Sequence, residues 1–381
     1  MNSFPAVVNS FPAVDPIPLP APLWLFKLLH IVTLSLHFVA VEILLGGLLL
    51  AVLLSTRPAG SPAHIAARAM GRRLTVVMTY VINLGVPPLL FAQVLYGRAL
   101  YTSSVLIGAW WISIIAVLTL TYWLLYQFSF RLEAGKSAWW VGLLAWLGCG
   151  GVARLLSINM TLMLRPEAWR GMYAASGAGV YLPQGDPTTT PRWILMLCGG
   201  LFVAGLWMIY LAGRSTFAPQ EKLFLAGFGG KVAALFGVLY LGAGIWANSV
   251  QPAAVKAGIA SGLGGHPIYH YFGFAAYGWL LLVAVTVLVA AAAGFTRISA
   301  GWIGWTAALL TLLFEICFVV YRDAIRDVTL LTKGYDVWDR VVVTNWSVVG
   351  IFLVLFVAGL GIVGWLISVV ARAQKPMEGA A

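Results

Sequence analysis

The sequence predicts an all-α, polytopic membrane protein with about nine transmembrane helices. Of its 381 residues, 61% are hydrophobic and only 9% are charged, and the mean hydropathy is +0.93. Apolar stretches recur at lengths that can cross a hydrocarbon core of ~30 Å, which takes about 20 helical residues. The 17 Trp suit the aromatic belts found at membrane interfaces. This composition leaves little chain for a soluble domain.

The chain divides into a short tail at each end and one transmembrane domain. Residues 1–22 are rich in proline and contain the sequence NSFPAV twice, which predicts a disordered N-terminal tail. A cleaved signal peptide is not expected, because a basic n-region is missing and the apolar stretch that follows is long. The transmembrane domain is expected over 23–372 and a cytoplasmic tail over 373–381.

The basic residues predict the orientation of the spans. If the N-terminus is outside, the cytoplasmic segments carry most of the unbalanced Arg and Lys, whereas acidic residues accompany the basic ones in the opposite loops. We therefore expect a multi-pass protein of the bacterial inner membrane, with its N-terminus outside and its C-terminus cytoplasmic. The net charge of +11 is explained by these loops and does not indicate nucleic-acid binding. The predicted spans are 23–54, 75–97, 105–130, 138–163, 192–213, 222–248, 270–294, 301–321 and 347–371.

Histidines gather toward the outer side of this predicted topology. His30 and His37 lie in the first span, His270 begins the seventh, and His266 just precedes it. Ionisable groups inside a span are costly and favour a functional interpretation. His30 and His37 share nearly one helix face but lie about 10 Å apart along the axis, so each needs a partner from another helix to bind a metal.

Two imidazoles from different helices are what a bis-histidine haem b requires. The predicted iron ligands are His37, or His30, with His270. Arg154 is the best-placed cation for the haem propionates, and Lys231 is a second one. The alternative is that each histidine hydrogen-bonds a backbone carbonyl or a neighbouring side chain. The chain has no CxxCH motif and so attaches no c-type haem itself.

Two glutamates and several glycine pairs lie in the same spans. Glu42 points away from His37 and either pairs with Lys231 or is protonated. Glu315 is expected to reach the outer layer. It is a candidate haem-binding residue, a candidate proton carrier or the partner of Arg322. The glycine pairs predict close helix packing rather than phosphate binding, and the sequence has no Walker, HExxH or GxSxG motif that would indicate a hydrolase. The glycine pairs are Gly46-Gly47, Gly199-Gly200 and Gly229-Gly230.

Several stretches carry a family resemblance through their order along the chain. They are HFVAV at 37–41 with Gly46-Gly47, NLGVPP at 83–88 with FAQ at 91–93, NMT at 159–161 with RPEAW at 165–169, QPAAVK at 251–256, and YFGF at 271–274. Together they resemble subunit I of the bd-type quinol oxidases. The resemblance implies nine membrane helices, an outside N-terminus, and His37 and Glu315 as residues that bind a high-spin haem.

Departures from that family change the expected function. The fifth-helix histidine that binds the low-spin haem is missing from 191–200, and Tyr277 occupies the place of its methionine partner. The third span, 105–130, has no carboxylate to deliver protons, and the quinol loop is reduced to about 249–269. The sequence therefore predicts a bd-like scaffold without oxidase function.

Three hypotheses follow from this scaffold. The first is a membrane subunit of a respiratory electron-transfer complex that holds haem b near the periplasmic face and exchanges electrons with quinol and c-type cytochrome partners. The second is a haem-free anchor that docks periplasmic cytochromes through loops 165–191 and 322–346. The third is a divergent terminal oxidase with other proton donors. A transporter is the least supported, because the sequence has no obvious inverted repeat.

Overall fold

The computed structural model describes residues 11–12, 17–260 and 267–373; for 267–276, 367 and 370–373 the description is limited to the backbone. Eleven helices form the described part. They are α1 Leu23–Ser55, α2 Pro62–Leu106, α3 Gly108–Glu133, α4 Trp139–Leu162, α5 Pro166–Ala175, α6 Thr189–Ala212, α7 Pro219–Ser249, α8 Ala253–Ala260, α9 Pro267–Thr296, α10 Gly301–Thr332 and α11 Trp346–Ala373.

Nine helices of the described chain are long and apolar enough to cross a membrane, which confirms the predicted fold class. The two short helices, α5 and α8, lie in connections between spans. The clearest difference in boundaries is α2, predicted over 75–97 but helical from Pro62. Its first turns are basic, so hydropathy detects them poorly, but Ser61 caps them by accepting from the His64 backbone N–H, and proline suits the first helical position.

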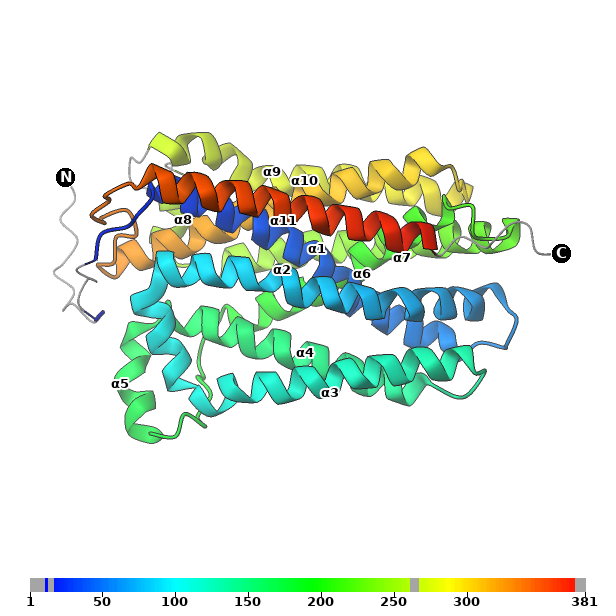
Figure 1. Ribbon diagram of the computed structural model, residues 1–381, viewed down its shortest axis with the longest axis horizontal. Coiled ribbons are helices and arrows are strands. Elements are labelled where there is room, and N and C mark those ends of the chain that lie inside the picture. The colour runs from blue at the N-terminus through cyan, green and yellow to red at the C-terminus, as the bar shows by residue number, and fades with distance from the viewer. Residues whose placement is uncertain (1–10, 13–16, 261–266, 374–381) are drawn as a thin grey trace.

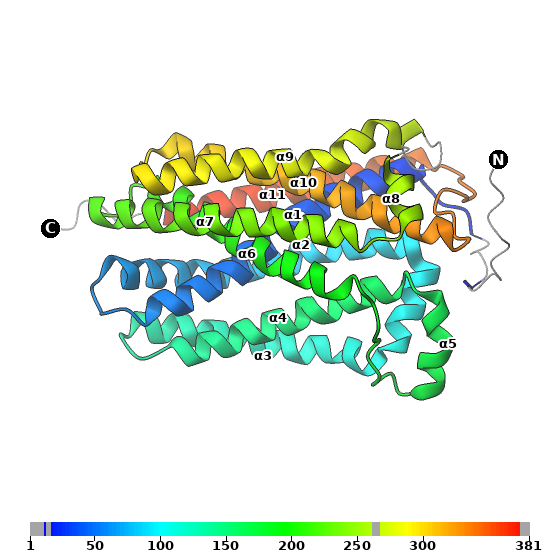
Figure 2. The same ribbon diagram turned by 180° about the vertical axis from the view of Figure 1, so that it is seen from behind.

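The long helices run side by side as one bundle (Figures 1 and 2). Helix α5 lies across one end, where α1 and α9 also begin, and α11 runs from this end toward the other one (Figure 1). We call the first of these the α5 end. The predicted topology makes it the outer, periplasmic end.

Helix α1 is the centre of the packing. It contacts α2, α4, α6 and α10, and 61% of the residues in its most apolar 18-residue stretch are buried. A methyl group on Gly46 would overlap the backbone carbonyl of Gly200, so this pair allows α1 and α6 to approach closely. The predicted packing role of these glycines is confirmed.

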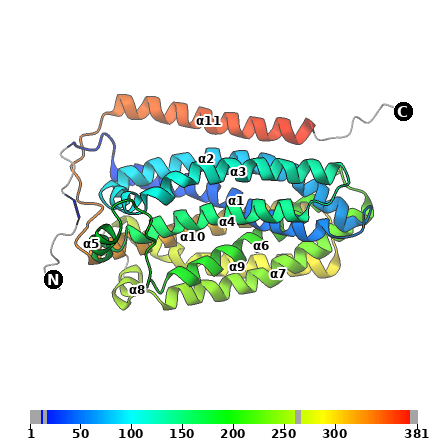
Figure 3. The same cartoon turned by 90° about the horizontal axis from the view of Figure 1, so that it is seen from below.

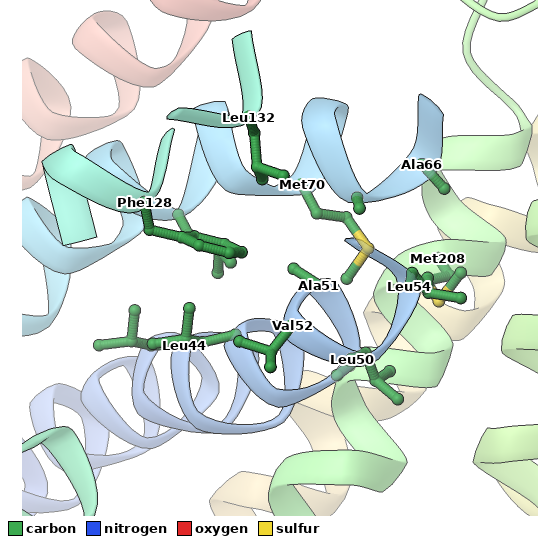
Figure 4. Close-up of a cluster of buried hydrophobic side chains, with 14 of the residues drawn as sticks. Leu44, Leu50, Ala51, Val52, Leu54, Ala66, Met70, Phe128, Leu132 and Met208 are labelled. Atoms are coloured by element: carbon green, nitrogen blue, oxygen red, sulfur yellow. The ribbon is translucent and has the colours of Figure 1, made fainter. Parts of the chain in front are cut away.

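Away from the α5 end, the bundle is held by aliphatic packing. Buried side chains of α1, α2, α3, α4, α6 and α7 form one hydrophobic cluster, in which Met70 and Phe128 lie over α1 (Figure 4). The labelled members in Figure 4 are Leu44, Leu50, Ala51, Val52, Leu54, Ala66, Met70, Phe128, Leu132 and Met208.

Helix α11 lies along one side of the bundle and stands apart from it (Figure 3). Only 6% of the residues in its most apolar 18-residue stretch are buried. Val349 and Phe352 provide the contact, the latter edge-to-face against Phe91 with ring centroids 6.3 Å apart. Most of the α11 surface is therefore available to lipid or to another membrane protein.

The described part of the N-terminal segment packs against the α5 end. Phe11 packs edge-to-face on Trp169 and Tyr335. The backbone of Leu19 exchanges hydrogen bonds with Val341 and Val343. Residues 1–10, 13–16 and 374–381, and His266 in the segment 261–266, lie outside the described residues.

Candidate functional site

His30 has both ring nitrogens engaged. Its Nδ1 lies 3.0 Å from the carbonyl oxygen of Pro88, and its Nε2 lies 3.2 Å from Nη1 of Arg326. Arginine only donates hydrogen bonds, so Nε2 accepts and the Nδ1–H donates to Pro88. The ring is buried and neutral, and it leaves no nitrogen for an iron ion. The alternative interpretation, a histidine bonded to a backbone carbonyl, describes this residue.

A buried ionic network surrounds His30. Nζ of Lys27 lies 2.9 Å from Asp323 and 2.6 Å from Asp327, and Arg326 lies 3.6 Å from Asp323. Two cations thus face two carboxylates, and all four side chains are buried. Buried ions are tolerated when they are paired and hydrogen-bonded in this way.

Tyr96 joins α2 to this network. Its hydroxyl donates to Asp323 at 2.6 Å and accepts from Lys27 at 2.6 Å. The Lys27 ammonium and the Arg326 guanidinium lie 4.9 Å and 4.8 Å from the centre of its ring. The backbone of α2 leaves helical geometry at Tyr96 (φ −124°, ψ 17°), so the break lies where the side chain enters the network.

Sequence reasoning missed this network for one physical reason. The eighth span was expected to end at residue 321, whereas α10 continues to Thr332. The continuation places Asp323, Arg326 and Asp327, spaced i, i+3 and i+4, on one helix face. Charged residues at that spacing among apolar neighbours are the signal that could have revealed the network.

His37 packs against α2. Its ring lies within hydrogen-bonding reach of the Val81 backbone, and a methyl group on Gly85 would come within 2.9 Å of its Cε1 atom and 3.1 Å of its Nδ1 atom. Nδ1 is buried and, among the described residues, has no hydrogen-bond partner. Gly85 therefore provides the space that this imidazole occupies.

The packing of the helices does not bring α1 and α9 together along their length. Helix α1 contacts α2, α4, α6 and α10, whereas α9 contacts chiefly α7 and α10. Both begin at the α5 end (Figures 1 and 2), but His37 lies well inside α1 and His270 lies in the first turn of α9. His37 lies about 21 Å along α1 from its first residue at 1.5 Å per residue, whereas His270 lies about 5 Å along α9 from its first residue. The side chain of His270 lies outside the described part of the structure.

Glu42 and Glu315 form a second buried group, nearer the middle of the bundle. Glu42 is 5% exposed and Glu315 is completely buried, and their carboxyl groups lie within hydrogen-bonding reach of each other, with Arg322 as the nearby cation. Lys231 is exposed, so the alternative pairing of Glu42 with Lys231 is not observed. In the described structure, the surroundings of Glu315 are those of a paired carboxyl group.

The predicted propionate-binding residue Arg154 is only partly buried. Its guanidinium lies 5.6 Å from the centre of the Trp193 ring, a cation–π contact between α4 and α6. Tyr277, which takes the place of the family's methionine ligand, is 36% exposed and packs beside Tyr321 with ring centroids 6.0 Å apart.

Aromatic side chains fill the interior between α6, α7, α9 and α10. Phe202 stacks on Phe314 at 5.4 Å, and Tyr240 and Trp279 pack edge-to-face at 5.6 Å. Phe318 completes the group, 5.2 Å from Trp279. These rings are buried and belong to one core cluster. Inserting a porphyrin here would require displacing several of them.

The α5 end carries an exposed apolar surface. Tyr173 and Val343 are 65% and 63% exposed, and they lie in the two loops predicted to dock partners. A depression of about 530 Å³ lies between α2 and α5, lined by Tyr101, Val105 and Trp169 among others.

No protein-family model matches the chain, and no curated protein is similar to it. Among solved structures, it is similar to a chain of the bd oxidase from Geobacillus thermodenitrificans, with a TM-score of 0.65, 11% sequence identity, and alignment over 94% of this chain and 100% of that one. This likeness shows a distant relationship at the level of the fold: the chain is a multi-pass membrane protein with a bd-oxidase-like bundle.

Proposed function

We propose that this chain is a membrane subunit of a respiratory electron-transfer complex, in which the bd-like bundle acts as a haem-free platform. Its α5 end docks a periplasmic c-type cytochrome, which carries the electrons. The bd-oxidase-like fold supports the respiratory context.

The haem-free part of the proposal rests on the contacts that the candidate haem ligands already make with other side chains. Both nitrogens of His30 are hydrogen-bonded, Glu315 faces Glu42, and aromatic rings occupy the interior beside α10. A haem b needs an axial ligand with a free lone pair and a flat apolar cavity. The described side chains around α10 supply neither.

Exposed apolar groups at the α5 end support docking. Singly exposed apolar residues are ordinary on a protein surface, but apolar groups rimmed by polar ones mark interaction sites. Here Tyr173, Val180 and Val343 are exposed, and Arg170 and Arg340 lie three residues before Tyr173 and Val343 in the sequence. A partner with an acidic rim around an apolar patch fits this surface.

An optical spectrum tests the proposal. The chain, purified from a host supplied with haem, should show no stoichiometric haem b absorbance. When the chain is expressed with its native neighbours, covalently bound c-type haem should copurify with it. Val343→Asp should lower the amount of copurified c-type haem at least tenfold without changing the elution volume of the free chain. Val357→Asn, in the lipid-exposed face of α11, is the matched control. A c-haem yield unaffected by Val343→Asp would contradict docking at this end.

One observation favours a second function, a subunit that itself holds haem b. Nδ1 of His37 is a buried imidazole nitrogen without a hydrogen-bond partner among the described residues, as expected of an unused ligand. In this alternative, His37 is an axial ligand of the iron, and the haem supplies one-electron chemistry. Stoichiometric haem b that is lost in His37→Ala but retained in His30→Ala would establish this alternative and exclude the haem-free platform.

A further inference from the structure

Two carboxyl groups meet in the interior of the bundle, far from either end. Glu42 extends from α1 and Glu315 from α10, and both are buried. Gly199 of α6 makes room for them, since a methyl group there would come within 2.5 Å of the Glu42 Oε1 atom and 3.0 Å of the Tyr240 ring. The site is thus enclosed by α1, α6, α7 and α10.

When both glutamates are ionised, the pair has hydrogen-bond acceptors but no donor. An ionised carboxylate can only accept hydrogen bonds. Oε2 of Glu42 and both carboxyl oxygens of Glu315 are buried and receive no hydrogen bond from any described donor, although the two groups lie within hydrogen-bonding reach of each other. A proton on one of them would supply the missing donor.

The surrounding charges also indicate that the pair binds one proton. Arg322 of α10 is the cation near both glutamates. Tyr240 of α7 lies beside Gly199 of α6, and its buried hydroxyl has no hydrogen-bond partner among the described residues. Trp279 of α9 packs against Tyr240. Two carboxylates in contact cannot both ionise in a site of low dielectric constant. One proton leaves a single negative charge, which balances Arg322.

We propose that Glu42 and Glu315 share one exchangeable proton and form a proton-binding site inside the membrane-spanning bundle. The O–H of one carboxyl group donates to the carboxylate oxygen of the other, and Arg322 compensates the remaining charge. The site contains no group that the docking function requires, so it stands or falls separately from that function.

Infrared spectroscopy of the purified full-length chain in lipid nanodiscs at pH 8 tests this proposal. At this pH exposed carboxyl groups are ionised, so a carboxylic-acid C=O band that shifts in D₂O reports a buried protonated group. We expect this band in the wild-type chain and its loss in both Glu42→Gln and Glu315→Gln, because either variant leaves a single ionised carboxylate beside Arg322. Glu133→Gln, at an exposed surface pair, is the matched control and should retain the band.

Several outcomes would overturn the proposal. One is a wild-type spectrum without the band, and another is persistence of the band in either single variant. A third is a wild-type protein that lacks the band and whose thermal stability rises with added Na⁺, which would indicate a bound cation instead of a proton. If a variant does not fold, the wild-type spectrum alone still decides whether a proton is bound. The double variant Glu42→Gln/Glu315→Gln should be less stable than either single variant, since it leaves Arg322 without a counter-charge.

Discussion

Single residues set how closely the helices of this bundle approach one another. Gly46 and Gly200 bring the backbones of α1 and α6 into direct contact, as small residues do in membrane proteins. Other glycines, such as Gly242 of α7, have open space around them. The same residue type therefore has very different importance at different positions.

Gly46→Ala should destabilise the protein, because the added methyl group overlaps the Gly200 carbonyl and forces α1 away from α6. Overpacking of this kind costs about 1–3 kcal/mol. Thermal unfolding in detergent should show a lower midpoint for Gly46→Ala and an equal or higher one for Gly242→Ala, because alanine favours a helix more than glycine does where space allows. Equal midpoints for the two variants would mean that the helices separate without cost.

Lys27→Met should be among the most damaging single substitutions. It leaves Asp323 and Asp327 buried with one cation for two carboxylates, and breaking a buried ion pair costs about 3–5 kcal/mol. The matched control is Lys333→Met, which removes a partly exposed pair with Glu167 worth less than about 1 kcal/mol. The yield of monodisperse protein and its unfolding midpoint measure the difference; a Lys27→Met chain as stable as the control would refute the role of the network.

At the scale of elements, α2 and α11 contrast. Helix α2 contains Pro87 and Pro88 and breaks at Tyr96, yet its outer part is fixed by the ionic network and by the packing of Leu95 and Leu100. Helix α11 is regular but barely buried. Regular helical geometry is thus no guide to which element holds the bundle together.

Removal of α11 should leave the rest of the bundle folded. Truncation after Asn345 retains the backbone bonds of Leu19 and Pro20 to 341–345 and removes few buried contacts. The truncated chain should insert, elute as a single species and unfold within a few degrees of the full chain. Aggregation of the truncated chain in a mild detergent would show that α11 contributes more than its contacts indicate.

The charges of the whole molecule predict its orientation. Basic loops lie at the end opposite α5, and the positive-inside rule predicts that this end is cytoplasmic. The functional proposal depends on this, because a periplasmic cytochrome can reach only the outer end.

Reporter fusions test the orientation. A fluorescent protein that folds only in the cytoplasm should fluoresce when fused to the C-terminus, and alkaline phosphatase inserted at Gly177, after α5, should be active. Each reporter exchanged to the other site is the control and should be inactive. The reversed pattern would place the α5 end inside and rule out docking of a periplasmic partner there.

The sequence by itself determined the number of spans and their approximate limits, because a bilayer of fixed thickness demands apolar runs of matching length. It also indicated where glycines let helices pack closely. Only the tertiary structure decided which charged residues meet: Lys27 and Asp323 are separated by 296 positions, and Glu42 faces Glu315 rather than Lys231. Hydropathy governs whether a helix enters the membrane but does not encode which helices become its neighbours, so the partners of buried ionisable groups emerge only when the bundle is assembled.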